Sequence, residues 1–292
     1  MDARFGLATV LLKQRKAEEG WRLYARGRTP AGAAAHRIPA RPWRGETLPG
    51  TLLVDTDQGL GDVLQFIRFA SIARRRVARL IVFCDEYCAP LKPLLASLPG
   101  IDAIVDRHSG AQAVAATCLA SELPHLLGLG ESAFDAAGPY LAPPAGRVGQ
   151  WRERVAPLPG LRVGLCWSGN PRVGSADAHR LDARRSLPAA RLRPLMETRG
   201  VTIVSLQKQP ADAGALGAAL VDWTGELSDF GDTAALVANL DLVVSVDTSV
   251  VHCAGAIGTP VWMLDRFDNC WRWGTDPAQP GWYAGLRVFR QA

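Results

Sequence analysis

The sequence predicts an α/β protein made of two units, each with a parallel β-sheet and helices on both faces. Strand and helix signals alternate along 51–144, a proline- and glycine-rich stretch interrupts them near 139–160, and the alternation then restarts. The chain has 292 residues, 48% hydrophobic and 21% charged, which is enough for two domains of about 100–150 residues each.

The first unit opens with the apolar run TLLVDT, which is typical of a buried strand. Its predicted elements are strand 51–56, helix 61–76, strand 79–85, helix 87–97, strand 101–106 and helix 118–128. Those of the second unit are helix 147–156, strand 162–169, helix 187–198, strand 201–207, strand 220–225, helix 232–240, strand 241–247, helix 249–258 and strand 260–264. Ligands of such folds bind at the carboxyl ends of the strands, and here also between the two units.

Residues 3–27 predict two short helices, because apolar side chains recur at helical spacing around Leu11 and again from Trp21 to Tyr24. The pair resembles the end of a tetratricopeptide repeat, but only one copy is found, and one such unit cannot bury its own apolar face. It is therefore either the remainder of a longer repeat array or an appendage that packs on the main body. The limits we expect are 1–28 for this pair, 29–47 for a linker anchored by Trp43, and 48–145 and 146–292 for the two α/β units.

Composition excludes several classes of function. Lysine and arginine outnumber aspartate and glutamate by 33 to 28, and the densest cluster, at 74–76, is better explained as the end of a helix than as a nucleic-acid surface. We find no signal-peptide pattern and no apolar run near the ~20 residues that span a bilayer. The six cysteines lack zinc spacing and suggest buried free thiols. We therefore expect a cytoplasmic protein with no metal, no other cofactor, no nucleic-acid partner and no membrane span.

The most informative stretch of the second unit is DLVVSVDTSVVHCAGAIGTPVWML, at 241–264. A buried strand ends at Asp247, the hydroxyls of Thr248 and Ser249 follow, and a helix begins with His252 in its first turn. A helix N-terminus offers free backbone N–H groups and a partial positive charge, which suit a phosphate or a set of sugar hydroxyls. The alternative is that Asp247 or Thr248 only caps the helix and His252 packs against the sheet.

Two further strand ends carry polar residues. The loop within 164–188 holds Ser168, Asn170 and Arg185, with Arg172 and Arg184 beside them, and a connection of this length is often functional, although a solvated surface loop fits its composition. Gln207 and Lys208 follow the strand at 201–207. Three adjacent strand ends with hydroxyls, amides and cations would form a phosphate-binding site.

A glycine turn also follows the first strand, in TLLVDTDQGLGDVLQFIRFA at 51–70. Gln58, Gly59 and Gly61 form the turn, and Asp62 stands where the helix begins, so that Asp62 is either a helix cap or a catalytic group. The dinucleotide-binding glycine pattern is incomplete because residue 64 is leucine, and Asp57 is better explained by turn chemistry than by a metal.

These segments resemble a known family. DQGLGDVLQFIRF, GLCWSGNP, RRSLP, SLQK, DTSVVH and the tryptophan-rich end are similar to bacterial tetratricopeptide-repeat proteins whose C-terminal region resembles glycosyltransferase family 9, the lipopolysaccharide heptosyltransferases. The resemblance covers most of 43–292, and GLGD and DTSVVH are its most specific pieces. Ser249 stands where the heptosyltransferases carry glycine, and Arg185 where they carry lysine.

The resemblance implies a GT-B fold, with two Rossmann-like domains facing across a cleft, and transfer of a hexosyl, heptosyl or N-acetylhexosaminyl group without a metal. A nucleotide-diphosphate sugar would bind mainly the C-terminal domain, and a glycan or protein hydroxyl would accept the sugar. Asp62 matches the general base, and Gln58, Gly59 and Gly61 form the acceptor-side loop. The implied donor-binding residues are Ser168, Asn170, Arg185, Gln207, Lys208, Asp247, Thr248, Ser249 and His252. The alternative is a non-catalytic nucleotide-sugar-binding or scaffold protein of a repeat-containing assembly.

Overall fold

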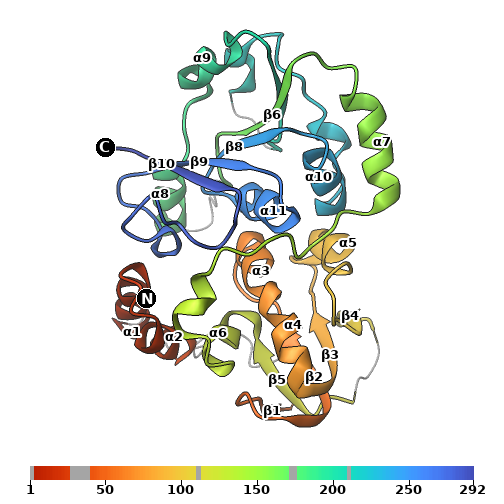
Figure 1. Cartoon of the computed structure of the whole chain (residues 1–292), viewed down its shortest axis with the longest axis vertical. Coiled ribbons are helices and arrows are strands. Elements are labelled where there is room, and N and C mark those ends of the chain that lie inside the picture. The colour runs from red at the N-terminus through yellow and green to blue at the C-terminus, as the bar shows by residue number, and fades with distance from the viewer. Residues whose placement is uncertain (1–2, 27–39, 110–112, 171–175, 209–211) are drawn as a thin grey trace.

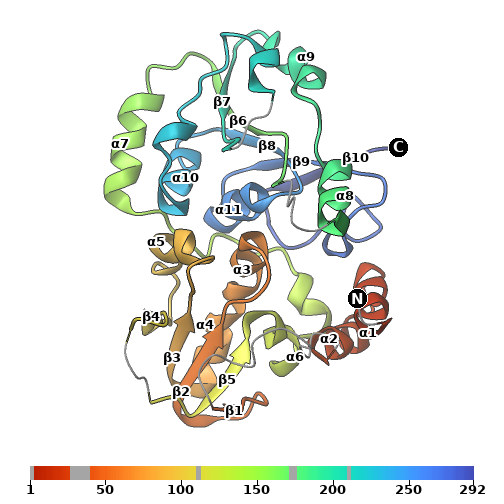
Figure 2. The same ribbon diagram turned by 180° about the vertical axis from the view of Figure 1, so that it is seen from behind.

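The protein folds around two separate five-stranded sheets, in which all strand pairs are parallel. A computed structural model describes residues 3–26, 40–109, 113–170, 176–208 and 212–292. Helices lie on the faces of both sheets, and α3 (Leu60–Phe66) and α5 (Lys92–Leu95) of the first unit face α10 (Phe230–Val237) and α11 (Ser249–Ile257) of the second (Figures 1 and 2). The predicted α/β class with two parallel sheets is thereby confirmed.

The first sheet has the order β1-β5-β2-β3-β4. Its strands are β1 (Arg41–Pro42), β2 (Leu48–Asp55), β3 (Val77–Phe83), β4 (Ala103–Val105) and β5 (Ala116–Leu119). Leu53 of β2 lies opposite Ile81 on one side and Thr117 on the other. Because β2 has a partner on each side and helices cover the faces, its second half, 52–55, is buried.

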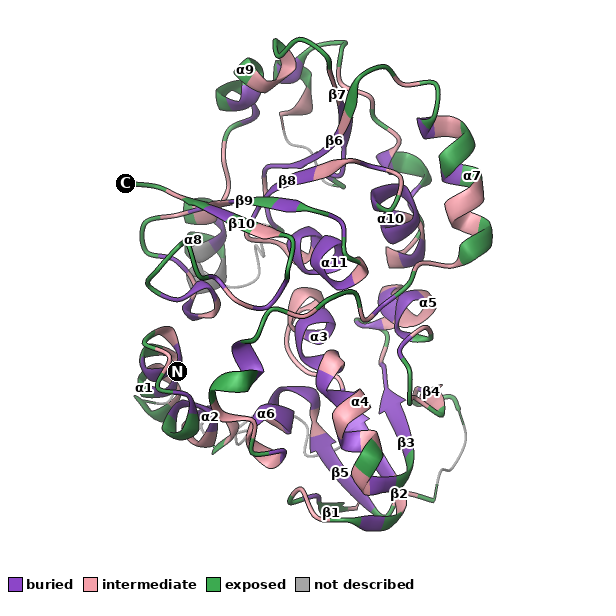
Figure 3. Ribbon diagram, in the orientation of Figure 1, coloured by how far each residue is buried: buried purple, intermediate pink, exposed green. Residues whose placement is uncertain are grey.

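The second sheet has the order β10-β9-β8-β6-β7. Its strands are β6 (Leu161–Cys166), β7 (Val201–Ser205), β8 (Leu242–Val246), β9 (Val261–Asp265) and β10 (Leu286–Arg290). The central strand β8 pairs Val244 with Leu165 and with Trp262. The central strand β8 is almost continuously buried, as expected for a parallel sheet covered by helices, whereas Trp262 on its neighbour β9 is exposed (Figure 3).

The helices of the two units are mostly short, and several pass into 3₁₀ turns. The first unit contains α3 (Leu60–Phe66), η1 (Ile67–Phe69), α4 (Ala70–Ala73), η2 (Arg74–Arg76), η3 (Ala89–Leu91), α5 (Lys92–Leu95), η4 (Ala120–Glu122), α6 (Leu123–Leu126) and η5 (Gly130–Phe134). The second contains α7 (Ala145–Val155), α8 (Ala176–Arg185), η6 (Ala189–Leu192), α9 (Arg193–Met196), η7 (Ala213–Leu216), η8 (Thr224–Glu226), α10 (Phe230–Val237), α11 (Ser249–Ile257) and η9 (Trp271–Trp273). No helix of the described ranges is long and apolar enough to cross a bilayer.

The N-terminal helices α1 (Ala3–Lys13) and α2 (Ala17–Arg26) pack on the main body. Trp21 stacks on Phe134 with 5.2 Å between ring centroids, and it meets Trp271 and Trp282 edge-on. The tryptophan-rich end of the chain is therefore a packing surface for these helices. The pair contacts residues of both units, although its relation to tetratricopeptide repeats stays a prediction.

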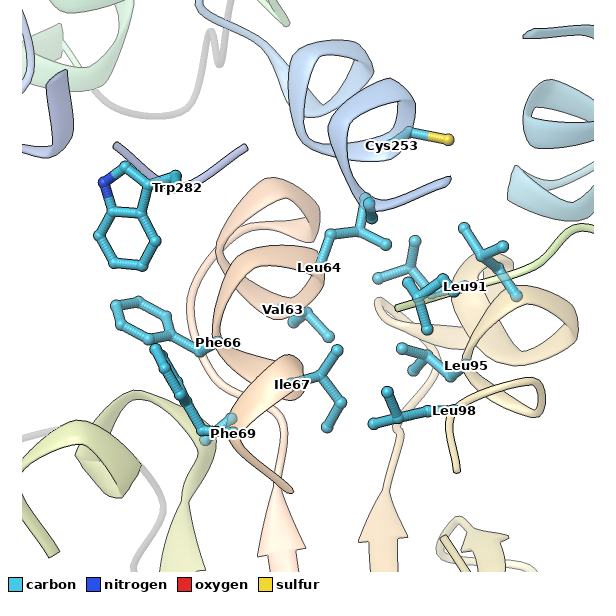
Figure 4. Packing of buried hydrophobic residues seen from close by; sticks show 14 of the residues in the cluster. Val63, Leu64, Phe66, Ile67, Phe69, Leu91, Leu95, Leu98, Cys253 and Trp282 are labelled. Carbon is cyan, nitrogen blue, oxygen red and sulfur yellow. The ribbon is translucent and has the colours of Figure 1, made fainter. Parts of the chain in front are cut away.

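The two units share one apolar core where α3 meets α11. Val63 and Leu64 of α3 lie between Leu91 and Leu95 of the first unit and Cys253 of α11 (Figure 4). All five side chains are 2% exposed or less. This buried apolar contact therefore contributes to holding α3 and α11 together.

Several local predictions were wrong. The strands β1, β5 and β10 were missed, because they are two, four and five residues long and, in β10, partly exposed. The segment 220–225 is not a strand, since only Val221 bridges to Val204. The long loop within 164–188 contains α8, whose polar sequence hides its helical pattern. The limits 48–145 and 146–292 stay a prediction.

Candidate functional site

The N-terminus of α11 lies at the carboxyl end of the central strand β8. Thr248 is the N-cap residue, and its Oγ1 accepts a hydrogen bond from the Val250 N–H at 3.3 Å. Ser245 Oγ lies 3.1 Å from the same oxygen. Asp247 precedes the cap and Ser249 begins the helix, so the predicted strand–cap–helix order is present.

Arg185 reaches this helix terminus from α8. Its Nη1 donates to the Asp247 carbonyl oxygen at 2.9 Å, and its Nε donates to Asp182 Oδ1 at 2.8 Å. A side chain at Gly169 would collide with this ion pair, because its Cβ would lie 2.0 Å from Asp182 Oδ1. The structure therefore brings Arg185 and Asp247 together, as the sequence suggested, but Arg185 has a carboxylate partner within its own helix.

The side chains of Gln207 and Lys208 form hydrogen bonds with backbone groups of the protein. Gln207 Oε1 accepts from the N–H groups of Trp167 and Ser168 at 3.0 and 2.8 Å, which fixes the end of β6. The Lys208 ammonium group donates to the Leu227 carbonyl. Asn170 is the last residue that the structure describes before 171–175. Arg172 lies outside the described residues.

His252 is enclosed inside the protein. It is 4% exposed, its ring stacks on Trp273 with 5.5 Å between centroids, and its Nδ1 lies 2.8 Å from the Tyr283 hydroxyl. Burial lowers the pKa of His252 to about 4, so the ring is neutral near pH 7. Four ionic side chains act electrostatically on the ring, namely Asp247, Arg272, Asp62 and Arg185. Three of the predicted residues, Asp62, Arg185 and Asp247, are therefore close enough to the buried ring to influence its pKa.

Asp62 enters this group from the first unit. It is the third residue of α3, and its Oδ2 accepts from the Gly59 N–H at 2.9 Å, which makes it part of the helix cap. Its Oδ1 forms an ion pair with Arg272. The carboxylate is thus held at the meeting point of α3 and the C-terminal segment.

The glycine turn before α3 is closed by neighbouring elements. A Cβ at Gly61 would lie 2.7 Å from His252 Cδ2 and 3.4 Å from Ser249 Cα, so glycine allows α3 to approach α11. Gln58 has a φ of +70°, and its Oε1 accepts from the Tyr24 hydroxyl at 3.1 Å. At this turn it is therefore α11 that lies close to the backbone of Gly61. Gln58 is in contact with Tyr24 of α2.

Sequence reasoning missed the residues that connect these groups. Arg272 Nε donates to Gln65 Oε1 at 2.7 Å, and Tyr283 binds His252. Both come from the tryptophan-rich end, in which the sequence analysis singled out no polar residue. The signal was an arginine enclosed between two tryptophans, in Trp271-Arg272-Trp273, since a buried cation needs an anionic partner.

Two cavities lie beside this group. The larger of the two, about 510 Å³, lies between Arg15 at the α1–α2 turn, Phe134 of η5 and the segment around Pro280, and Tyr283 contributes to its lining. Among the described residues no cluster of three potential metal ligands occurs. Asp57 accepts from the N–H and hydroxyl of Ser121 in η4 at 3.1 and 2.7 Å, which is a long-range contact and not the local turn hydrogen bond that we expected.

The fold is similar to solved structures of glycosyltransferase family 9. The family 9 glycosyltransferase of Veillonella parvula superposes with a TM-score of 0.59 at 16% identity, over 84% of this chain and 87% of that one. ADP-heptose lipopolysaccharide heptosyltransferase II of E. coli gives 0.53 at 14%, over 83% and 91%. E. coli heptosyltransferase WaaC with ADP gives 0.53 at 14%, over 83% and 93%. At these identities the likeness establishes the fold.

Among curated proteins, the chain is similar to Protein FlbA of Caulobacter vibrioides. The two are 29% identical over 318 aligned positions, which cover 98% of this chain and 51% of FlbA. The chain therefore spans about half the length of this relative. No family model matches the sequence.

Proposed function

We propose that the protein transfers a sugar from a nucleotide-diphosphate sugar to an acceptor hydroxyl. One observation carries the proposal: Arg185, the N-terminus of α11 and Asp62 converge around His252, in a fold similar to that of family 9 glycosyltransferases. Nucleotide-sugar transfer needs a cationic site for the leaving diphosphate and a base for the acceptor, and this arrangement supplies residues for both.

The diphosphate would bind at the N-terminus of α11, against the backbone N–H of Ser249 and the guanidinium of Arg185. Arg185 has five N–H donors, and its contacts with Asp182 and Asp247 occupy no more than three. Thr248, Ser168 and Asn170 would lie beside the phosphates, and Asp247 and His252 beside the sugar. Gln207 and Lys208 would support this site indirectly, since both bind the backbone.

Asp62 would act as the general base. A carboxylate has about four acceptor positions, and Gly59 and Arg272 occupy two of them. The acceptor hydroxyl would give its proton to Asp62 while its oxygen bonds to the anomeric carbon. The bond from that carbon to the diphosphate oxygen would break, and the electron pair would remain on the diphosphate, stabilised by Arg185 and α11.

We also propose a class of acceptor, a class of donor sugar and a location in the cell. Either a glycan or a protein hydroxyl would serve, and the transfer would need no metal. The donor sugar would be a hexose, a heptose or an N-acetylhexosamine. A cytoplasmic location is supported by five cysteines that are both free and buried within the described residues.

A screen of nucleotide sugars by thermal shift, followed by calorimetry, tests the proposal. One donor should raise the melting temperature, and its free nucleoside diphosphate should bind at the same site and compete with it. Release of the nucleoside diphosphate in the presence of an acceptor would then demonstrate transfer. If no nucleotide sugar of a broad set binds at millimolar concentration, the proposal is wrong.

A second candidate is a non-catalytic nucleotide-sugar-binding or scaffold protein. It is favoured by the contacts of Asp62, whose two oxygens bind Gly59 and Arg272, and by the packing of Gly61 on His252. Binding of a nucleotide sugar without turnover, over many candidate acceptors, would support it.

A further inference from the structure

A buried tyrosine of α2 is hydrogen-bonded to the glycine turn that precedes α3. The Tyr24 hydroxyl donates to Gln58 Oε1 at 3.1 Å, and Tyr24 is fully buried. Its ring packs against Phe66 of α3 and Trp271 of η9, with 6.2 and 5.3 Å between ring centroids. Phenylalanine would fill the same apolar space, so the tyrosine adds a hydrogen bond to the turn.

Gln58 has a backbone conformation that glutamine disfavours. Its φ of +70° lies in the left-handed region, which glycine adopts freely and other residues adopt under strain. Its Nε2 is buried and has no hydrogen-bond partner among the residues that the structure describes. Because both features raise the energy of the turn, contacts from outside the turn must maintain it. Within the described ranges, the hydrogen bond of the Gln58 side chain comes from Tyr24.

The residue after Gln58 carries the contact to Asp62. The Gly59 N–H donates to Asp62 Oδ2 at 2.9 Å, and Arg272 of the second unit pairs with Oδ1. The peptide unit between Gln58 and Gly59 is planar, so the conformation of Gln58 sets the direction of the Gly59 N–H. Holding Gln58 in place therefore directs this N–H at the Asp62 carboxylate.

We propose that Tyr24 is a positioning residue for Asp62, acting through Gln58 and the Gly59 N–H, so that the N-terminal helix pair contributes to catalysis. The inference rests on the proposed function, in which Asp62 takes the proton of the acceptor hydroxyl. A base must keep its oxygen within hydrogen-bond reach of that hydroxyl, and a carboxylate that rotates spends less time in this geometry. Because Tyr24 is fully buried, it meets neither substrate, and its loss should change the rate of transfer and not the binding of the donor.

Hydrogen exchange of the Gly59 amide, followed by NMR in the full-length protein, tests the turn without any substrate. Tyr24→Phe keeps the ring and removes the hydroxyl, so the Gly59 amide should exchange about tenfold faster than in the parent. The Val244 amide, in the central strand β8, reports global unfolding and should change by a clearly smaller factor. Equal acceleration of both amides, or no acceleration at Gly59, would overturn the proposal.

Gln58→Gly tests whether the effect of Tyr24 passes through the turn. Glycine adopts a φ of +70° without strain and offers the Tyr24 hydroxyl no side-chain acceptor. In the Gln58→Gly background, Tyr24→Phe should therefore have no further effect on the Gly59 amide, as a comparison of the single and double variants would measure. The same acceleration in both backgrounds would show that Tyr24 acts by another route, against the proposal.

The rate of sugar release tests the catalytic consequence. ADP-glucose, UDP-glucose and GDP-mannose would each be supplied with water as the acceptor, and release of the nucleoside diphosphate would be followed. For the donor that the parent turns over, Tyr24→Phe should lower kcat about tenfold and leave the Kd of the donor unchanged.

Trp21→Phe is the matched control on the same helix. Trp21 stacks on Phe134 and donates to the Gly130 carbonyl oxygen, so its replacement loosens α2 without removing the hydrogen bond to Gln58. It should keep most of kcat, and an equal loss in both variants would mean that Tyr24 only anchors the helix pair. If the parent turns over none of the three donors, the proposed transfer from them fails, while amide exchange still decides whether Tyr24 holds the turn.

Discussion

Arg272 and Asp62 form an ion pair that joins the tryptophan-rich segment to the first turn of α3. Their side chains are 11% and 21% exposed, and Arg272 also donates to Gln65. Burial tends to lower the pKa of Arg272, but Asp62 together with Cys270, Tyr24 and Asp247 raises it by more, and the pKa lies well above its usual value. Arg272 therefore stays charged and depends on Asp62 for its stabilisation.

Replacement of Arg272 by methionine should destabilise the protein. The change leaves the Asp62 carboxylate and Gln65 Oε1 without their partner in a largely buried place, which should cost about 3 kcal/mol in the free energy of unfolding. Urea unfolding would measure it. The exposed pair of Arg41 and Glu46 is the control, and Arg41→Met should cost less than about 1 kcal/mol. Equal effects of the two changes would contradict a buried role for Arg272.

The sequence predicts the inner strands and the helix termini best. The strand at β8, the cap at Thr248 and the helix at α11 follow from a buried apolar run, a hydroxyl residue and a final glycine, which are all local signals. The short edge strands β1 and β10 carry weaker signals, because their pattern is too brief or too exposed to separate from loops.

Only that part of the candidate site whose residues lie in one continuous segment could be predicted from the sequence. Asp247, Thr248 and Ser249 are adjacent in sequence, so their grouping needed no tertiary information. The partner of Asp62 comes from 210 residues away, and nothing in the local pattern at Arg272 specifies which carboxylate it meets. Long-range pairs of this kind are decided by how the two units pack, which a single sequence does not encode in any short motif.

Arg185→Ala should weaken the binding of a nucleoside diphosphate. Loss of a charge-assisted hydrogen bond should raise the binding free energy by about 1.5–3 kcal/mol, as measured by calorimetry. Arg184→Ala is the matched control, because Arg184 lies on the same helix but is exposed and pairs with Asp268. A dissociation constant that changes by the same factor in both variants would remove Arg185 from the proposed site.

Gly61→Ala should destabilise the contact between α3 and α11. The new Cβ would lie 2.7 Å from His252 Cδ2, so the helices must separate, at a cost of about 1–3 kcal/mol. Gly149→Ala in α7 is the control, since no atom lies within 4 Å of the added Cβ. That change should stabilise by about 0.5–1 kcal/mol through helix propensity. Equal stability of Gly61→Ala and the parent would show that the two helices are not tightly packed there.

Acid should destabilise the protein through His252. Its pKa is lowered from 6.5 to about 4 in the folded state by burial, so between these values the unfolded chain binds the proton more readily. This proton costs no stability above about pH 6.5; the loss of stability grows as the pH falls and reaches about 3 kcal/mol below about pH 4. Urea unfolding at pH 7 and pH 4.5 would compare the parent with His252→Gln. The stability gap between them should shrink at the lower pH, and a constant gap would contradict the shift.

Asp62→Asn separates catalysis from structure, provided that the ion pair is taken into account. Asparagine can still accept from the Gly59 N–H, but it leaves Arg272 without a counter-charge, so some loss of stability is expected whatever the role of Asp62. The matched control is Arg272→Met, which breaks the same pair and keeps the carboxylate. Both variants should be compared at a temperature well below their melting points.

If Asp62 is the general base, Asp62→Asn should lower the rate of sugar transfer by about 10²–10⁴-fold, because the acceptor hydroxyl then has no group to take its proton. Arg272→Met should lose far less, since its carboxylate remains beside the acceptor. The substrate dissociation constant should change little in Asp62→Asn, because proton removal contributes to the transition state and not to binding. Equal losses of rate in the two variants would mean that Asp62 serves only to cap α3 and to pair with Arg272.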